Sequence, residues 1–252
     1  CLYERYPGTV GRGCSRIGFF EGELIKKLGL IGGIGPESTL LYYKKITERV
    51  YKRENLFPPL LIESLDVHRV LSYCGQRDYA GLTAYLDKGI TNLAAGGAQV
   101  VAMTGNTPHI VFDKLSEKSH VPLVSSVAVT AHYVAEQGLK RPLLLGTLFT
   151  MREDFFKKAF RDKGIEAIVP EAADQLKVHE FIEKELEAGI VTEKAQKYFS
   201  DLVEEMIGSH HIDTLILGCT ELPILFEMMN ISVPVVDVTD VHVEALIKAV
   251  KK

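Results

Sequence analysis

The chain has 252 residues, of which 46% are hydrophobic and 25% are charged, a composition typical of a globular protein with one large or two small domains. Lys and Arg number 29 against 33 Asp and Glu, so the formal net charge is −4 and no basic surface for nucleic acid is expected. The longest apolar runs, such as 98–103 and 214–217, are far shorter than the roughly 20 residues of a membrane helix. Composition therefore favours a protein that acts on small molecules, without nucleic-acid or membrane partners.

The cysteines predict neither a disulfide framework nor a metal site. Cys1, Cys14, Cys74 and Cys219 form no Cys-x-x-Cys pair, and the histidines lack acidic or thiol companions at metal-ligand spacing. We therefore expect free thiols in a cytoplasmic protein that binds no metal. Residues 1–27 lack the apolar core of a secretory signal, and we interpret them as an N-terminal extension.

From Lys27 onward, short apolar runs bounded by Gly or Pro alternate with longer stretches of helical spacing. The runs predict buried strands at 28–31, 59–62, 99–103, 122–124, 142–145, 214–217 and 233–236. Helical spacing is clearest at Leu82, Tyr85, Leu86, Ile90 and Leu93. Residues 175–209 hold two helical patterns that break near Gly189, with Thr192 as the N-cap of the second. The alternation predicts an α/β fold of mainly parallel sheets flanked by helices.

Two segments of the chain resemble each other. Residues 99–109 and 213–223 are both an apolar strand that runs into Gly-x-Thr. The repeat predicts two pseudo-symmetric α/β domains that face each other across a cleft, with the ligand beyond the carboxyl ends of the strands. The C-terminal helix, from Asp240, is expected to pack back on the first domain. The predicted boundaries are 28–125 plus 237–252 for the first domain and 126–236 for the second.

The two turns carry groups that suit an anionic ligand. Gly105-Asn106-Thr107 offers main-chain N–H groups, an amide and a hydroxyl. Cys219 stands in the corresponding turn, where a helix N-terminus lowers the pKa of a thiol, although the neighbouring Glu221 opposes that effect. A plainer interpretation is that Thr107 and Thr220 are helix N-caps.

A Gly-rich turn follows the first predicted strand. It runs from Gly32 to Thr39 and opens a helix with Pro36 in the first turn. The segment satisfies neither Gly-x-Gly-x-x-Gly nor the Walker pattern with its Lys. A nucleotide cofactor is therefore not expected.

Taken together, five segments resemble the aspartate/glutamate racemase family, the cofactor-independent amino-acid racemases. They occur in the family's order and are Gly29–Thr39, Asn106–His109, Leu145–Thr147 with Thr150-Met151, Pro170–Ala172 with Lys177, and Leu217–Leu222. The resemblance covers the chain from about Lys27 to its end. It implies an active site between two α/β domains, no cofactor, a homodimer, and an acidic amino acid or small dicarboxylate as substrate.

The same resemblance implies roles for particular residues. Family members use one Cys from each domain, on opposite faces of the substrate α-carbon, and Cys219 corresponds to the second. The first Cys normally stands immediately before Asn-Thr. This chain has Gly105 at that position, and Thr104 is the candidate to replace the missing Cys. The expected ligands of the α-carboxylate are Asn106, Thr107, Thr147 and Thr220, and Lys177 is the expected ligand of the side-chain carboxylate.

Three functions stay open from the sequence. The first is an amino-acid racemase that removes and returns the α-proton. The second, favoured by Gly105, is a decarboxylase or lyase of the same superfamily that protonates its intermediate with a single Cys. The third is a non-catalytic protein that binds dicarboxylates.

Overall fold

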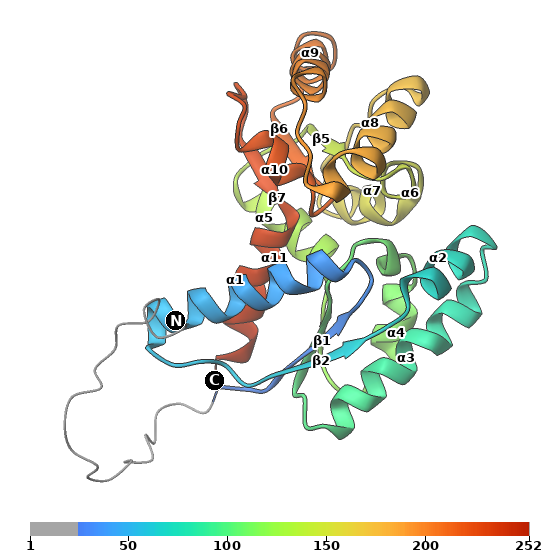
Figure 1. Cartoon of the computed structure of the whole chain (residues 1–252), viewed down its shortest axis with the longest axis vertical. Coiled ribbons are helices and arrows are strands. Elements are labelled where there is room, and N and C mark those ends of the chain that lie inside the picture. The colour runs from blue at the N-terminus through green and yellow to red at the C-terminus, as the bar shows by residue number, and fades with distance from the viewer. Residues whose placement is uncertain (1–24, 252) are drawn as a thin grey trace.

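The computed structural model describes residues 25–251, so the predicted N-terminal extension lies outside the described residues except for 25–27. Those three residues lie against the body of the fold. The N–H of Lys26 donates to the carbonyl of Val250 at 2.8 Å, and the N–H of Gln99 donates to the carbonyl of Lys27 at 2.8 Å. Figure 1 shows two α/β units, one above the other, each built on its own sheet.

The first unit contains a parallel sheet of four strands in the order β2-β1-β3-β4. The strands are β1 (Leu28–Gly32), β2 (Leu60–Ser64), β3 (Val100–Met103) and β4 (Leu123–Val124). The helices between them are α1 (Pro36–Glu54), α2 (Val67–Gly75), α3 (Tyr79–Ala95), the 3-10 helix η2 (Thr107–Val111) and α4 (Phe112–Lys118).

The second unit contains a parallel sheet of three strands in the order β5-β6-β7. The strands are β5 (Pro142–Leu145), β6 (Thr214–Leu217) and β7 (Val235–Asp237). The helices of this part of the chain are α5 (Ser126–Glu136), α6 (Leu148–Arg152), α7 (Asp154–Arg161), α8 (Ala172–Lys184), the 3-10 helix η3 (Leu186–Ala188), α9 (Glu193–His210) and α10 (Leu222–Phe226), and the C-terminal helix is α11 (Val238–Val250).

Strands β1, β3, β5 and β6 are buried on both faces. In the first unit, Leu30 packs with α1 and α11, whereas its neighbour Ile31 packs with α2 and α3. In the second unit, Leu143 packs with α8 and α9, whereas Leu144 packs with α5 and α7. Successive side chains of a strand point to opposite faces, so continuous apolar runs are the pattern expected of such sheets. The predicted fold class is confirmed.

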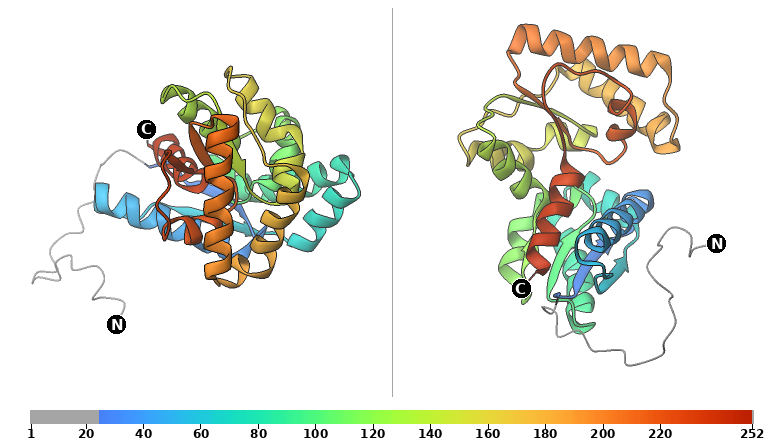
Figure 2. Two further views of the ribbon diagram at one scale, coloured as in Figure 1. Left: turned by 90° about the horizontal axis from the view of Figure 1, so that it is seen from above. Right: turned by 90° about the vertical axis from the view of Figure 1, so that its left-hand side faces the viewer.

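Helix α11 follows the last strand of the second unit and packs on the first. It contacts α1, α5, β3 and β4, and Figure 2 shows it running beside α1. The buried His242 lies at the centre of this contact: the hydroxyl of Tyr42 lies 2.8 Å from Nδ1 of His242, and its Nε2 lies 3.1 Å from the carbonyl of Val124. The precise domain boundaries stay a prediction.

The structure bears on several local predictions. Thr192 caps α9, since its hydroxyl accepts a hydrogen bond from the N–H of Ala195 at 3.1 Å. The capping interpretation of Thr107 and Thr220 is wrong, because η2 begins at Thr107 itself and α10 begins only after Glu221. None of the described helices is both long and apolar enough to cross a membrane.

Candidate active site

The turn after β3 and the turn after β6 meet where the two units face each other. The amide nitrogen of Asn106 donates a hydrogen bond of 3.0 Å to the carbonyl of Gly218, which stands immediately before Cys219. The N–H of Gly218 in turn donates to the carbonyl of Leu145 at the end of β5. The carboxyl ends of strands from both sheets are therefore in contact, as expected for a ligand site in parallel sheets.

The Gly-rich turn after β1 closes against the same region. Gly33 has a φ of +78°, and an added Cβ would lie 2.2 Å from the carbonyl of Leu65, so this position requires glycine. The turn leads into α1, where the hydroxyl of Ser38 donates to the carbonyl of Thr104 at 2.6 Å. This contact connects the beginning of α1 to the turn after β3.

Thr104 lies inside the first unit. Its side chain is buried, and its hydroxyl donates to the carbonyl of Ile31 at 3.2 Å and lies 3.2 Å from the hydroxyl of Thr39. A hydroxyl already held in two contacts must break them before it can transfer a proton to a substrate. The catalytic role of Thr104 stays a prediction, and this placement does not favour it.

Gly105, the residue after Thr104, has no side chain. Its backbone lies outside the left-handed region, unlike that of Gly33. An added Cβ would lie 3.1 Å from the carbonyl oxygen of Ile34 and 3.4 Å from its Cγ2, which requires a shift of a few tenths of an ångström. The backbone therefore does not itself require glycine here.

A buried hydrogen-bond network orients Asn106. The hydroxyl of Ser126, at the start of α5, donates to Oδ1 of Asn106 at 2.7 Å. The N–H of Ser126 donates to Nε2 of His109 at 3.1 Å, so the proton of the neutral ring is on Nδ1, which lies 3.1 Å from the carbonyl of Gly105. Burial lowers the pKa of His109 to about 4. The amide of Asn106 is thus fixed with its nitrogen toward the second unit.

The sequence did not indicate this network. His109 belongs to the Asn-Thr-Pro-His motif, but the sequence indicates no partner for it, and Ser126 lies outside every motif described above. The position of His109 within that motif is the local signal of a role. Ser126 lies 17 residues further along the chain from His109, and nothing local connects the two.

Cys219 donates its thiol hydrogen to a carboxylate. Its Sγ lies 2.7 Å from Oε2 of Glu221, and the hydroxyl of Thr220 donates to Oε1 of the same carboxylate at 2.9 Å. Burial and the charge of Glu221 raise the pKa of Cys219 well above its usual value. This direction is opposite to the effect expected of a helix N-terminus, since burial is the largest cause of the shift and the charge of Glu221 is the next. A raised pKa favours the protonated thiol at neutral pH.

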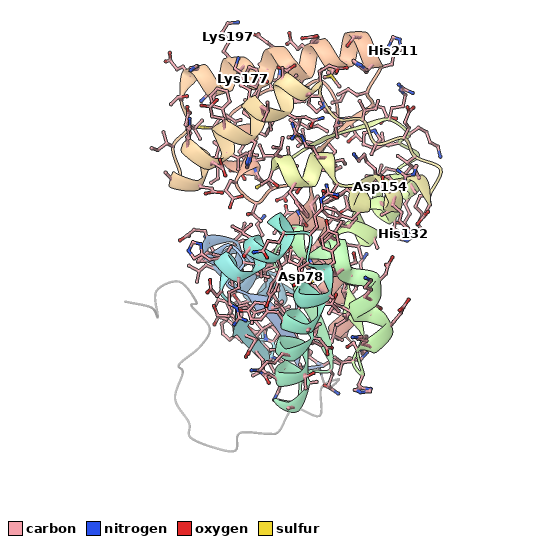
Figure 3. All side chains as sticks on the ribbon, turned by 90° about the vertical axis from the view of Figure 1, so that its right-hand side faces the viewer. Asp78, His132, Asp154, Lys177, Lys197 and His211 are labelled. Atoms are coloured by element: carbon pink, nitrogen blue, oxygen red, sulfur yellow. The ribbon has the colours of Figure 1, made fainter. Side chains whose placement is uncertain are left out.

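The other predicted binding residues fall into two groups. Thr147, which accepts from the N–H of Thr150 at 3.4 Å, lies in the turn after β5 beside the turn that holds Thr220, and Thr107 lies in the turn with Asn106. Lys177 lies apart: it is exposed on α8, and its ammonium is 4.2 Å from the ring centroid of Tyr198. Figure 3 shows Lys177 on the outer end of the second unit.

A cavity of about 490 Å³ opens beside Cys219 between the two units. One wall is the first half of α1, and the other is η3 together with the turn and helix around α10. The lining residues are Glu37, Ser38, Leu41, Lys45, Leu186, Glu187, Ala188, Gly189, Thr220, Glu221, Pro223, Ile224 and Glu227. Of the predicted site residues, Thr220 lines this cavity. Two other wall residues connect it to the site by hydrogen bonds, Ser38 to the carbonyl of Thr104 and Glu221 to the thiol of Cys219.

Comparison with known proteins places the chain in a family. The sequence profile described as Asp/Glu/hydantoin racemase matches residues 31–246. The broad-specificity amino-acid racemase RacX of Bacillus subtilis (strain 168) is 23% identical over 217 residues, covering 83% of this chain and 92% of that protein.

Solved structures agree with that match. An aspartate racemase homologue from Pyrococcus horikoshii is 34% identical, with a TM-score of 0.80 over 89% of this chain and 99% of that chain. A proposed Asp/Glu racemase from Yersinia pestis is 30% identical, with a TM-score of 0.83 and the same two coverages. Because the profile spans most of the chain and these relatives are covered almost completely, the chain belongs to the Asp/Glu/hydantoin racemase family.

Proposed function

We propose that the protein is an isomerase that moves the α-proton of an amino acid, with Cys219 as the group that gives and takes this proton. The observation that carries the proposal is the 2.7 Å hydrogen bond from the Cys219 thiol to Glu221, at the edge of the cavity between the units. A thiol next to a carboxylate acceptor can act as an acid directly and as a base after passing its proton to that carboxylate. Membership of a racemase family supports an amino-acid substrate.

The proposed reaction uses the protein's own side chains. The proton of Cys219 passes to Glu221, and the resulting thiolate takes the α-proton from the substrate, whose C–H electron pair delocalises into the α-carboxylate. Return of a proton to the α-carbon completes the cycle. Asn106, Thr107, Thr147 and Thr220 are the predicted ligands of the α-carboxylate.

Inversion of configuration requires a proton donor on the second face of the α-carbon. Thr104 is the predicted donor. The family resemblance implies a Cys immediately before Asn-Thr, and Gly105, which stands there, has no side chain. Proton exchange on the Cys219 face is therefore expected to be faster than inversion. The homodimer and the cytoplasmic location stay predictions.

One observation favours a second candidate function. The described residues include two cysteines. Cys74 is buried among the helices of the first unit, whereas Cys219 is hydrogen-bonded to Glu221 in the cavity wall. A decarboxylase of this superfamily needs one thiol: carbon dioxide leaves, its bonding electron pair stays on the α-carbon, and the thiol protonates that carbon.

The deciding experiment follows the α-proton of L-amino acids in deuterated buffer by proton NMR, with chiral chromatography of the same samples. We expect loss of the α-proton signal without loss of carbon dioxide, and Cys219→Ala should slow this exchange by about 10² to 10⁴-fold. Cys74→Ala is the matched control. Release of carbon dioxide from a substituted malonate would favour the second function, and binding without exchange or release would indicate a non-catalytic protein.

A further inference from the structure

The cavity beside Cys219 is lined by a large excess of negative charge. Its walls carry four carboxylates, from Glu37, Glu187, Glu221 and Glu227. Glu37 comes from the first unit and the other three from the second, so the charges surround the space.

Three of these carboxylates are available to a ligand. Glu221 is already bonded to Cys219 and Thr220. Among residues 25–251, no hydrogen bond or ion pair is made by the side chains of Glu37, Glu187 or Glu227. Partial burial and the charges of Glu221 and Glu183 raise the pKa of Glu187, so its carboxylate lies in a negative surrounding.

The one cation in this lining, within the described chain, is already neutralised. The ammonium of Lys45 lies 3.1 Å from Asp237 and 2.6 Å from Asp240. An acidic side chain in the cavity would therefore meet several like charges and no free positive group. The sequence-based candidate for that positive group, Lys177, lies outside the lining.

The rest of the lining is aliphatic. Leu41 from α1 lines the cavity, together with Leu186, Pro223 and Ile224 from the second unit. A chain of methylene groups that ends in a cation fits such a surface, since its stem can contact aliphatic side chains while its head reaches carboxylates.

We propose that this cavity selects amino acids with a cationic side chain, the class of lysine, ornithine and arginine, over acidic ones. Glu37, Glu187 and Glu227 are the specificity-determining residues: they attract the side-chain cation and repel a side-chain carboxylate. The inference rests on the proposed α-proton transfer, and it replaces the acidic substrate class that the family resemblance implies.

The test compares three substrates in the α-proton exchange assay: L-lysine, L-norleucine, which has the same four-carbon stem without the ammonium group, and L-glutamate. We expect kcat/KM for lysine to exceed that for norleucine by about tenfold or more, the size of one charged hydrogen bond, with glutamate lowest. Since the carboxylates are partly solvated, added salt should reduce the lysine advantage. A kcat/KM for glutamate equal to or above that for lysine overturns the proposal.

Variants locate the effect in the cavity. Glu187→Gln and Glu227→Gln should each lower kcat/KM for lysine by about three- to tenfold and change that for norleucine by less than twofold. Glu48→Gln, on the same helix as Glu37 but outside the lining, removes one charge from the chain and should change neither value. An equal loss for lysine in Glu48→Gln would show an effect of net charge and would count against the proposal.

Failure of the proposed chemistry is distinguishable from failure of the selectivity. If no amino acid exchanges its α-proton, saturation-transfer NMR measures binding of L-lysine and L-glutamate directly. Binding of lysine that weakens in Glu187→Gln upholds the charge selectivity and rejects the enzyme. Equal or preferential binding of glutamate rejects the selectivity whether or not the chemistry occurs.

Discussion

The side-chain amide of Asn106, in the first unit, donates a hydrogen bond of 3.0 Å to the main-chain carbonyl of Gly218, in the second. The two residues are 112 positions apart, and each belongs to one of the two Gly-x-Thr turns. The contact places Cys219, the residue after Gly218, relative to the residues that are predicted to hold the α-carboxylate. A shift of about 1 Å in such a site can cost 10²-fold in rate.

The first prediction concerns this contact. Asn106→Ala removes the donor to the buried carbonyl of Gly218 and the acceptor for the hydroxyl of Ser126, which keeps its contact with Nε2 of His109. We expect the free energy of unfolding in urea to fall by about 1 to 3 kcal/mol and α-proton exchange to fall by about 10²-fold. Asn230→Ala, on an exposed loop, is the control. Wild-type exchange in Asn106→Ala would show that the contact does not position the site.

The second prediction concerns the influence of Glu221 on Cys219. Because the charge of Glu221 raises the pKa of Cys219, Glu221→Gln should lower that pKa and increase the thiolate fraction at pH 7.5. Alkylation of Cys219 by iodoacetamide should then be faster, by about tenfold for each pKa unit. Mass spectrometry of the peptide that contains Cys219 separates it from the other thiols. An unchanged or slower rate would contradict the assignment of Glu221 as the proton partner.

The third prediction concerns Gly105→Cys, which places a thiol in the turn after β3. In Gly105→Cys the new Cβ lies close to the carbonyl of Ile34 and needs only a small shift, so we expect a folded protein that is less stable by about 1 kcal/mol. If the missing group limits inversion, the ratio of inversion to α-proton exchange should rise several-fold above that of the wild type. Gly105→Ala, with a Cβ and no thiol, controls for the backbone change.

Fast inversion by the wild type, keeping pace with exchange for both enantiomers, would show that another residue already serves the second face. Thr104 would then be the first residue to test. Thr104→Val keeps its shape and removes the hydroxyl that contacts Ile31 and Thr39.

The fourth prediction concerns stability against pH. Burial lowers the pKa of His109 from 6.5 to about 4 and that of His242 to about 3, so the unfolded chain binds more protons than the folded protein between these values and pH 6.5. Stability should therefore fall as the pH falls below 6.5. For His109 alone the loss from pH 7.5 to 5 is about 2 kcal/mol.

Urea unfolding at pH 7.5 and 5 measures this slope. His109→Gln should be less stable than the wild type at pH 7.5 and should lose less stability on acidification. His132→Gln, on the exposed face of α5, should keep the wild-type slope. A wild-type slope in His109→Gln would show that other groups control the acid transition.

Much of the fold follows from local sequence patterns. Each described strand overlaps one of the predicted apolar runs, and the break at Gly189 lies between α8 and α9. Both features could be predicted because burial in a parallel sheet and helical periodicity are visible within a few residues. The similarity of the two Gly-x-Thr turns and the position of Cys219 could likewise be identified from short segments.

Only the tertiary structure decided what those residues touch. Thr104 contacts Thr39, and Ser126 orients Asn106, because the fold brings distant segments of the chain together. The position of Lys177, exposed on α8 beside Tyr198, also depends on how the helices pack. The direction of the pKa shift of Cys219 also required the structure, since burial is its largest cause and no sequence pattern reports how deeply a turn is covered. The charge of the cavity was hidden for the same reason. Glu37 on α1 lies more than a hundred residues along the chain from the carboxylates of η3 and the region of α10.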